Sequence, residues 1–277
     1  MIDPQIRQIQ LKCLEILDIV HDICTRNGIK YSLCGGSVVG AHLYKGCLPW
    51  DDDIDIMMTR ENFNKFVKIA PKVLPKGYSL MSYHFCNMFS QGTLKIIDEN
   101  TTYVQSNGEV LGVFLDITVF DRVPVNKLLK IIELFFAKRL LTALTGKLPI
   151  NNLKSRIRNL LVSLFFSNKK KYFMFFEKMV CLFSKKCSQY TYSELFFCAY
   201  PQTISYRSSV FENYMMIEFE GKEYMIVRDY IEYLTTRYNR TDFREPEEKQ
   251  VAPHLILFNP NLPYKDYLKN SECNDGI

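Results

Sequence analysis

The chain has 277 residues and a formal net charge of +5, and this length can bury one sizeable core, or one core with an inserted lobe. Its nine cysteines form no C-x-x-C pair and its four histidines show no ligand spacing, which argues against a disulfide scaffold or structural zinc and predicts a reducing compartment. Because residues 1–10 lack a charged-then-apolar signal and no run of about 18 uncharged apolar residues occurs, we expect a cytoplasmic protein.

The first predicted element is a helix over residues 3–26. Asp3 is a suitable N-cap with Pro4 at the first helical position, and apolar residues recur every three or four positions until Asn27-Gly28. This pattern indicates a helix that packs on the core. Residues 29–34 then form a short apolar run typical of a strand.

A glycine turn, Gly35-Gly36-Ser37, follows this strand, and a helix of about two turns is predicted from Ser37 to Tyr44. Two glycines let backbone amides approach a phosphate with no Cβ in the way. Ser37 can cap the helix, whose N-terminus favours an anion. The turn therefore predicts the phosphate-binding end of a site.

Lys45 and Trp50 lie between this helix and the next motif. Lys45 can hold a phosphate, or it can be a solvated loop lysine. Trp50 is the only tryptophan, and its ring can wall the substrate pocket or fix the loop to the core. The sequence leaves both choices open.

Four aspartates, Asp51, Asp52, Asp53 and Asp55, crowd into five positions. Like charges a few Å apart raise each other's pKa unless a cation neutralises them. From Asp53 onward aspartate alternates with isoleucine, which is the period of a strand, so Asp53 and Asp55 are expected on one face. Two carboxylates on one strand face predict a site for Mg²⁺ or Mn²⁺.

Other sites and surfaces also contain such a cluster. Asp51, Asp53 and Asp55 match the first, third and fifth positions of a calcium loop, but Ile56 and Asn62 replace its glycine and glutamate, which argues against an EF-hand. An Asp-x-Asp pair also marks many metal-dependent glycosyltransferases. A solvated acidic turn would bind nothing. The last two alternatives remain open.

A further helix is predicted after Thr59, which is a suitable N-cap. Arg60 follows it, where its guanidinium can meet a pyrophosphate or lie on the surface. The pattern from 77 to 120 is typical of strands, and Lys95 in one of them is a weaker candidate for binding phosphate.

Asp116 lies inside an otherwise apolar predicted strand. A buried carboxylate is costly unless it is paired, hydrogen-bonded or metal-bound. We expect Asp116 to face Asp53 and Asp55 from a neighbouring strand, as a metal ligand or as a general base. The alternative is a structural aspartate that is bonded to the backbone.

A basic segment follows from 127 to 186, with fourteen Lys and Arg against two Glu. This is a net +12, so the rest of the chain carries −7. Its apolar stretches are rich in Phe and Leu, which indicates helices that lie on anionic lipid or helices that pack on the core with lysines outward. Nucleic-acid binding is disfavoured, because the aromatics are bunched in apolar runs.

The chain from 190 onward returns to mixed composition, with a predicted hairpin around Glu220-Gly221-Lys222 and then a helix. At this point the motifs can be taken together. Gly-Gly-Ser followed by Asp-Ile-Asp-Ile resembles the signature of the nucleotidyltransferase fold. The longer string from Lys45 to Ile56, with Pro-Trp directly before the aspartates, resembles the LicD family, which includes the fukutin-type transferases.

The chain departs from the family pattern at three places. Leu43-Tyr44 stands where the family commonly has Arg-His, and Val119 stands where it commonly has Pro. Residues 239–246 and His254 replace a usual Gly-Asp-Tyr, proline pair and histidines. All the carboxylates remain, so the comparison predicts an intact metal site with altered substrate contacts.

The resemblance implies an α/β (α+β) fold, a nucleotidyltransferase-like mixed sheet flanked by helices, with a basic helical insertion. Residues 1–126 would form the catalytic core, 127–189 the basic amphipathic lobe and 190–277 the C-terminal part of the catalytic domain. It implies metal-dependent transfer of a phospho-alcohol, such as phosphocholine or ribitol phosphate, from a CDP-linked donor to a hydroxyl of a glycan or lipid-linked glycan, releasing CMP.

In that reading Asp53, Asp55 and Asp116 hold the metal and Gly36 and Ser37 bind phosphate. A lipid-linked acceptor would place the protein at the inner face of the membrane, with peripheral contact. The rivals are a sugar-nucleotide glycosyltransferase, which releases a nucleoside diphosphate, and a catalytically inactive binding module.

Overall fold

The computed structural model describes residues 2–86, 89, 92–145, 168–196, 204–243 and 255–274. The middle of the predicted basic lobe and the departures from Arg244 to His254 lie outside these residues. The described chain divides into two compact units. Unit 1 comprises residues 1–80, 95–117 and 210–277, and unit 2 comprises 81–94 and 118–209.

The helices and strands alternate in the mixed α/β order that the sequence predicts. The described elements are α1 (Pro4–Arg26), β1 (Ser32–Leu33), α2 (Gly35–Tyr44), β2 (Asp55–Thr59), α3 (Arg60–Val73), β3 (Tyr78–Met81), β4 (Leu94–Asp98), β5 (Thr102–Gln105), β6 (Val110–Leu111), β7 (Phe114–Pro124), α4 (Lys127–Thr145), α6 (Lys169–Lys186), β8 (Tyr190–Ser193), β9 (Tyr206–Arg207), the 3₁₀ turn Ser208–Phe211, β10 (Tyr214–Phe219), β11 (Lys222–Val227), α7 (Tyr230–Tyr238), β12 (Leu255–Asn259) and α8 (Tyr264–Asn274).

Helix α1 forms as predicted. The carboxylate of Asp3 accepts a hydrogen bond from the Gln5 amide at 2.8 Å, with Pro4 at the first helical position. Its apolar stripe, from Ile6 to Cys24, is buried. The helix therefore serves the core of unit 1, as its periodicity indicates.

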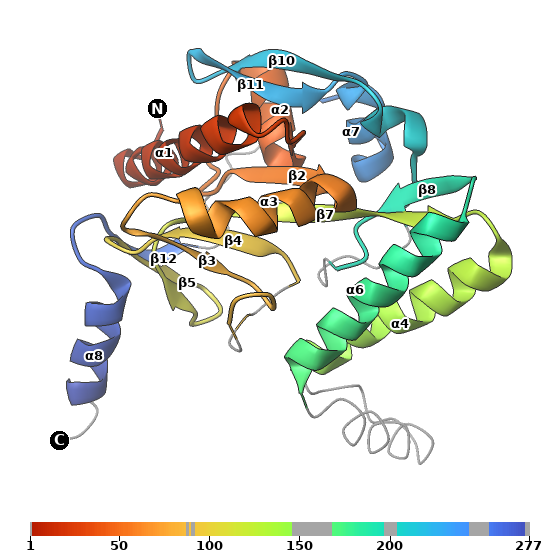
Figure 1. The fold of residues 1–277 in the computed structure, drawn as a ribbon. Coiled ribbons are helices and arrows are strands. Elements are labelled where there is room, and N and C mark those ends of the chain that lie inside the picture. The colour runs from red at the N-terminus through yellow and green to blue at the C-terminus, as the bar shows by residue number, and fades with distance from the viewer. Residues whose placement is uncertain are drawn as a thin grey trace. The chain divides into compact units, whose positions relative to one another are not determined.

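The main sheet has the order β1-β2-β7-β4-β3, and helices α2 and α3 pack with β2 (Figure 1). Helix α3 begins after Thr59, as predicted, and buries Phe63, Phe66 and Ala70. Strand β2 lies between β1 and β7, so a side chain at its start has a strand on either side. The predicted fold class, a mixed sheet flanked by helices, is confirmed.

The hairpin predicted around Glu220-Gly221 is also present. Strands β10 and β11 pair antiparallel from Tyr214↔Val227 to Phe219↔Lys222. Glu220 and Gly221 both have positive φ, 53° and 75°, which matches the right-handed twist of a two-residue hairpin. Glu220 lies at the tip of this hairpin, which belongs to unit 1. A separate sheet has the order β12-β5-β6.

Unit 2 is built on the second half of β7, which pairs with β8, and β8 pairs with β9. Helices α4 and α6 lie side by side (Figure 1). Their shared core includes Ala137, Phe173, Phe176 and Val180. Unit 2 contains the predicted lobe but also includes 81–94, 118–126 and 190–209. Among the described residues, no helix has both the length and the hydropathy that a membrane span requires.

Candidate functional site

The glycine turn links strand β1 to helix α2. Gly35 has φ +53°, which suits glycine, and its N–H donates to the Tyr233 hydroxyl at 3.0 Å. The helix begins at Gly35 with Cys34 as N-cap, two residues before the predicted start at Ser37. The positive φ of Gly35 lets the chain turn from the strand into the helix at once.

Ser37 joins this turn to strand β2. Its hydroxyl accepts a hydrogen bond from the Asp55 N–H at 3.0 Å, and its own N–H donates to the Cys34 carbonyl at 3.0 Å. The side chain that the sequence assigns to phosphate therefore fixes the backbone of an aspartate in this structure.

The glycines lie against the carboxylates. A Cβ on Gly36 would stand 2.6 Å from Asp51 Oδ2, and a Cβ on Gly35 would stand 3.7 Å from Asp55 Oδ2 and 3.8 Å from Arg237 Nε. A Cβ on Gly36 would force the Asp51 carboxylate to shift, whereas one on Gly35 would make only ordinary contacts, although at a positive φ. The turn thus places backbone and a guanidinium, both suited to phosphate, directly beside acidic oxygens.

Three consecutive aspartates form the centre of the site. Asp51, Asp52 and Asp53 each offer an oxygen within 4.8 Å of the others. Asp52 is 2% exposed, its Oδ2 accepts from the Tyr103 hydroxyl at 2.7 Å, and its buried Oδ1 has no hydrogen-bond partner. Burial, with the charges of Asp53 and Asp52, raises the pKa of Asp51 to about 8.

Asp55 and Asp116 come from neighbouring strands, β2 and β7. Burial raises the pKa of Asp55 well above its usual value, and the charges of Asp53, Asp116 and Asp51 add to this, while Arg237 lowers it. Asp55 therefore lies within electrostatic reach of the other carboxylates and of one cation.

The strand predicted from Asp53 begins instead at Asp55. Strand β1 has only two residues before the glycine turn, and its pairing with β2 ends at Leu33↔Ile56, short of Asp53. Asp53 is consequently in the loop before β2, where it clusters with Asp51 and Asp52.

The two lysines predicted to bind phosphate lie in different surroundings. Lys95 donates to Asp116 Oδ2 at 2.7 Å, is 4% exposed and lies 3.6 Å from the centre of the Phe114 ring. Lys45 caps the end of α2 and pairs with Glu218 at 2.8 Å on the surface. Of these two lysines, Lys95 lies at a carboxylate of the site, Asp116, whereas Lys45 pairs with Glu218.

Two further candidates have aromatic neighbours. Arg60 is buried at the start of α3, with its guanidinium 5.2 Å from the Phe63 ring centre. Trp50 is half-buried and meets Tyr44 edge to face at 6.3 Å between ring centres.

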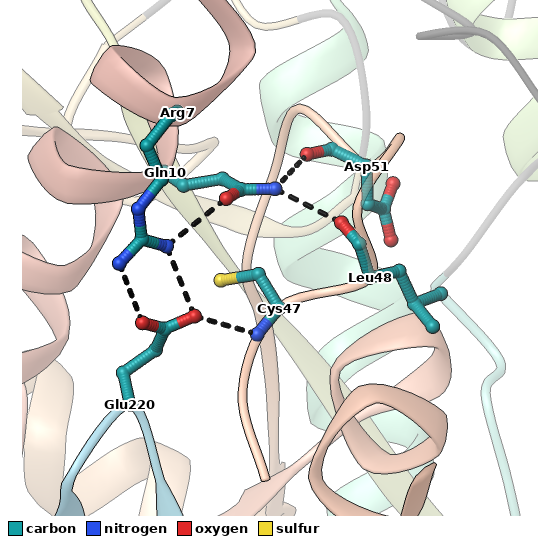
Figure 2. Close-up of polar contacts among 6 residues, drawn as sticks. All are labelled: Arg7, Gln10, Cys47, Leu48, Asp51 and Glu220. Atoms are coloured by element: carbon teal, nitrogen blue, oxygen red, sulfur yellow. Dashed lines mark hydrogen bonds and ion pairs between the residues drawn. The ribbon is translucent and has the colours of Figure 1, made fainter. Parts of the chain in front are cut away.

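A hydrogen-bond network supports the loop that carries the aspartates (Figure 2). Glu220 at the hairpin tip accepts two bonds from Arg7, at 2.6 and 3.0 Å, and one from the Cys47 N–H at 2.9 Å. Gln10 is fully buried, and its amide donates to the carbonyls of Leu48 and Asp51, both at 2.9 Å. Helix α1 and the hairpin thereby hold both ends of the loop.

The sequence reasoning missed several of these residues. Arg237 and Tyr233 come from α7, and Tyr103 comes from β5, far along the chain from the aspartates. No local pattern marks them. Gln10 did carry a signal, because it is a polar residue on the apolar stripe of α1, four positions after Ile6 and three before Cys13.

Comparison with known proteins identifies the family of this chain. A family model described as LicD/FKTN/FKRP, nucleotidyltransferase domain, matches residues 28–123, which contain the glycine turn and every site aspartate. The chain is 31% identical over 264 residues to lipopolysaccharide cholinephosphotransferase LicD of Haemophilus influenzae, covering 90% of this chain and 96% of that protein. The chain belongs to the LicD family. It is a LicD-like phosphotransferase.

Two other relatives match shorter parts of this LicD-family chain. The uncharacterized protein RP689 of Rickettsia prowazekii is 26% identical over 100 residues, 35% of this chain and 38% of that protein. The uncharacterized protein RT0683 of Rickettsia typhi is 33% identical over 70 residues, 25% of this chain and 23% of that protein. These alignments add no functional name.

Proposed function

We propose that this enzyme transfers a phospho-alcohol, with phosphocholine the first candidate, from a CDP-linked donor to a hydroxyl of a cell-surface glycan or its lipid-linked precursor. The acceptor oxygen forms a bond to the phosphorus that bears the alcohol. The bond between that phosphorus and the bridging oxygen of CMP breaks, and CMP leaves. The observation that carries the proposal is the contact of the Gly35-Gly36 turn with the aspartate cluster.

The residues fit a divalent cation, Mg²⁺ or Mn²⁺. Hard cations take carboxylate oxygens, and the cluster offers three within 4.8 Å of one another. The buried Oδ1 of Asp52 has no hydrogen-bond partner, which is costly for a carboxylate without a ligand. Asp53 and Asp55, with Asp51, Asp52 and Asp116 nearby, would hold the ion, which when bound offsets charge on the pyrophosphate.

The other residues act on the donor and the acceptor. The backbone of the glycine turn and the Arg237 guanidinium, placed beside Asp55, would bind phosphate oxygens of the donor. Asp116 would receive the proton of the acceptor hydroxyl or complete the metal site, with Lys95 donating to its Oδ2 at 2.7 Å. Lys95 would keep that carboxylate aimed at the reacting atoms.

The relative's name supports a biological setting for this proposal. Haemophilus influenzae LicD is a lipopolysaccharide cholinephosphotransferase, and a lipid-linked glycan as acceptor would bring this chain to the inner face of the membrane. The partners would be a CDP-alcohol and that glycan.

The decisive experiment incubates the full chain with Mg²⁺, lipopolysaccharide or a lipid-linked oligosaccharide, and CDP-choline, CDP-ethanolamine, CDP-ribitol or CDP-glycerol in turn. We expect CMP release from one donor, loss of release with EDTA, and at least a ~10³-fold drop in kcat for Asp53→Asn, because one metal ligand is lost.

Asp22→Asn, which changes an exposed aspartate paired with Arg26, is the matched control and should retain full activity. Full activity of Asp53→Asn would contradict the assignment. Release of a nucleoside diphosphate from a sugar nucleotide would identify a glycosyltransferase instead, and no metal affinity with no turnover would identify a binding module.

A further inference from the structure

Helices α4 and α6 in unit 2 bury one face against each other and the core. Ala137 of α4 and Phe173, Phe176 and Val180 of α6 lie in this core. The Tyr172 hydroxyl donates to the Phe136 carbonyl at 2.7 Å and fixes the two helices in register. These helices therefore pack on the core as the sequence allowed, and among their described side chains this packing uses one side of each helix.

The other faces present large apolar side chains to solvent. On α4 they are Leu128, Ile131 and Phe135, and on α6 they are Phe175 and Leu182, each at least 52% exposed. The spacings of three, four and seven residues place each set on a single helical face.

Aromatic rings connect the exposed apolar side chains of α4 with those of α6. The Phe135 ring lies 5.5 Å from that of Phe136, and the Phe136 ring lies 6.0 Å from that of Phe175. Phe135 and Phe175 are thus joined through Phe136, and we call the exposed apolar side chains of the two helices together the α4/α6 face. A contiguous exposed apolar patch of this kind marks an interaction site.

Lysines are interleaved with these apolar groups. On α6 the exposed order is Lys171, Phe175, Lys178, Leu182, Lys185, at steps of three or four residues. The acidic residues of the two helices lie elsewhere, because Glu133 is buried and Glu177 is mostly buried and lies 3.4 Å from the His84 ring. The charge of the α4/α6 face, over its described side chains, is therefore positive.

We propose that the α4/α6 face docks on an anionic membrane surface. Apolar side chains would enter the boundary between headgroups and acyl chains, and the lysines around them would meet lipid phosphates. The proposal rests on the proposed function only for its purpose, which is to bring the enzyme to an acceptor carried on lipid.

Other occupants fit less well. A second copy would bring the same lysines against these lysines, and like charges oppose such a contact. Nucleic acid would attract the lysines but leave leucine, isoleucine and phenylalanine side chains in water. An anionic bilayer satisfies the charge and the apolar groups together.

The test is co-sedimentation of the full chain with vesicles of phosphatidylcholine alone or with 30% phosphatidylglycerol added. We expect binding to the anionic vesicles at low salt and its loss in about 0.5 M NaCl. Lys171→Glu, Lys178→Glu and Lys185→Glu combined should weaken binding by at least about 100-fold, at roughly fivefold for each lysine. Phe175→Ser with Leu182→Ser should weaken binding at low salt also.

The matched charge control is Lys65→Glu, Lys68→Glu and Lys72→Glu combined, on exposed positions of α3, and the apolar control is Leu11→Ser on α1. Both should bind as wild type does. Circular dichroism and thermal unfolding check that every variant is folded.

Several results would overturn the proposal. They are no binding of the wild type to anionic vesicles at low salt, unchanged binding of the α4/α6 variants, an equal loss in the α3 control, or self-association in sedimentation that Phe175→Ser and Leu182→Ser abolish. CMP release with detergent-solubilised acceptor, measured on the same variants, should stay at the wild-type level. That readout separates failure of docking from failure of the phosphotransferase assignment.

Discussion

At the scale of single residues, the aspartates of the site can be predicted from the sequence, but the residues that contact them from other segments cannot. Asp51, Asp52, Asp53 and Asp55 are adjacent, so their mutual repulsion is evident before any fold is known. Arg237 and Tyr103 reach the same place from distant segments. Contacts between residues far apart in the sequence produce no local pattern, so these contacts could not be predicted.

Gln10 provides a test at this scale. Gln10→Met keeps the volume of the buried side chain but removes both donors to the Leu48 and Asp51 carbonyls. We expect a loss of about 2 kcal/mol in the free energy of unfolding and weaker Mg²⁺ binding, because the aspartate loop loses its tie to α1. Urea unfolding and isothermal titration with Mg²⁺ measure the two effects.

The control is Gln8→Met, on the exposed side of the same helix, which should change neither quantity. If Gln10→Met bound Mg²⁺ as tightly as wild type, Gln10 would serve the core of unit 1 and not the loop.

At the scale of elements, periodicity predicted the segments that have one buried face. Helix α1, helix α3 after Thr59 and the hairpin at Glu220-Gly221 all formed as expected. The errors lie at the site, where α2 starts two residues early and β2 two residues late. Both follow from the φ of Gly35, which turns the chain into α2 so soon that the β1–β2 pairing ends at Ile56.

Helix α4 carries a buried carboxyl that makes stability depend on pH. Burial, and then the charge of Asp121, raises the pKa of Glu133 to about 9, and both carboxylate oxygens lack a hydrogen-bond partner. In the unfolded chain Glu133 ionises near its usual 4.5. The folded state therefore holds an extra proton between these values, so the contribution of Glu133 lowers stability as pH rises from about 4.5 to about 9.

Glu133→Met should remove this contribution, because an apolar side chain of similar size needs no partner. We expect the variant to exceed wild type by at least about 2 kcal/mol at pH 8.5 and by much less at pH 5. Chemical unfolding at the two values measures the difference, with Glu212→Met at an exposed position as control. A difference that did not grow with pH would show that Glu133 is not protonated in the folded protein.

At the scale of the whole molecule, composition predicts the uneven charge but not the division into units. The lobe's excess of +12 is visible in the sequence. Unit 2, however, also takes in residues 81–94 and 190–209, which pack with α4 and α6 in one core that includes Tyr83 and Phe196. Such packing joins segments that composition assigns to the catalytic core.

Global stability should respond to divalent cations. Any ion that binds the folded state alone stabilises it by RT ln(1 + [L]/Kd), and here it would also relieve repulsion among Asp51, Asp52 and Asp53. We expect the unfolding temperature to rise with Mg²⁺ or Mn²⁺ from 0 to about 10 mM, at constant ionic strength, by roughly 2–4 °C for each kcal/mol. Differential scanning calorimetry measures it.

Asp53→Asn should reduce this rise and Asp22→Asn should not. An equal rise in both variants, or in a NaCl series, would mean that the ions act on general surface charge and that the aspartate cluster holds none of them.

The hairpin tip and helix α7 have a consequence for how the enzyme is made. Asp51, Asp52, Asp53 and Asp55 emerge from the ribosome long before Glu220, Tyr233 and Arg237, which hold or complete their surroundings. A prematurely terminated chain would contain the aspartate motif but not the residues of the hairpin and α7 that support it. The order of synthesis therefore delays assembly of this site until α7 has left the ribosome.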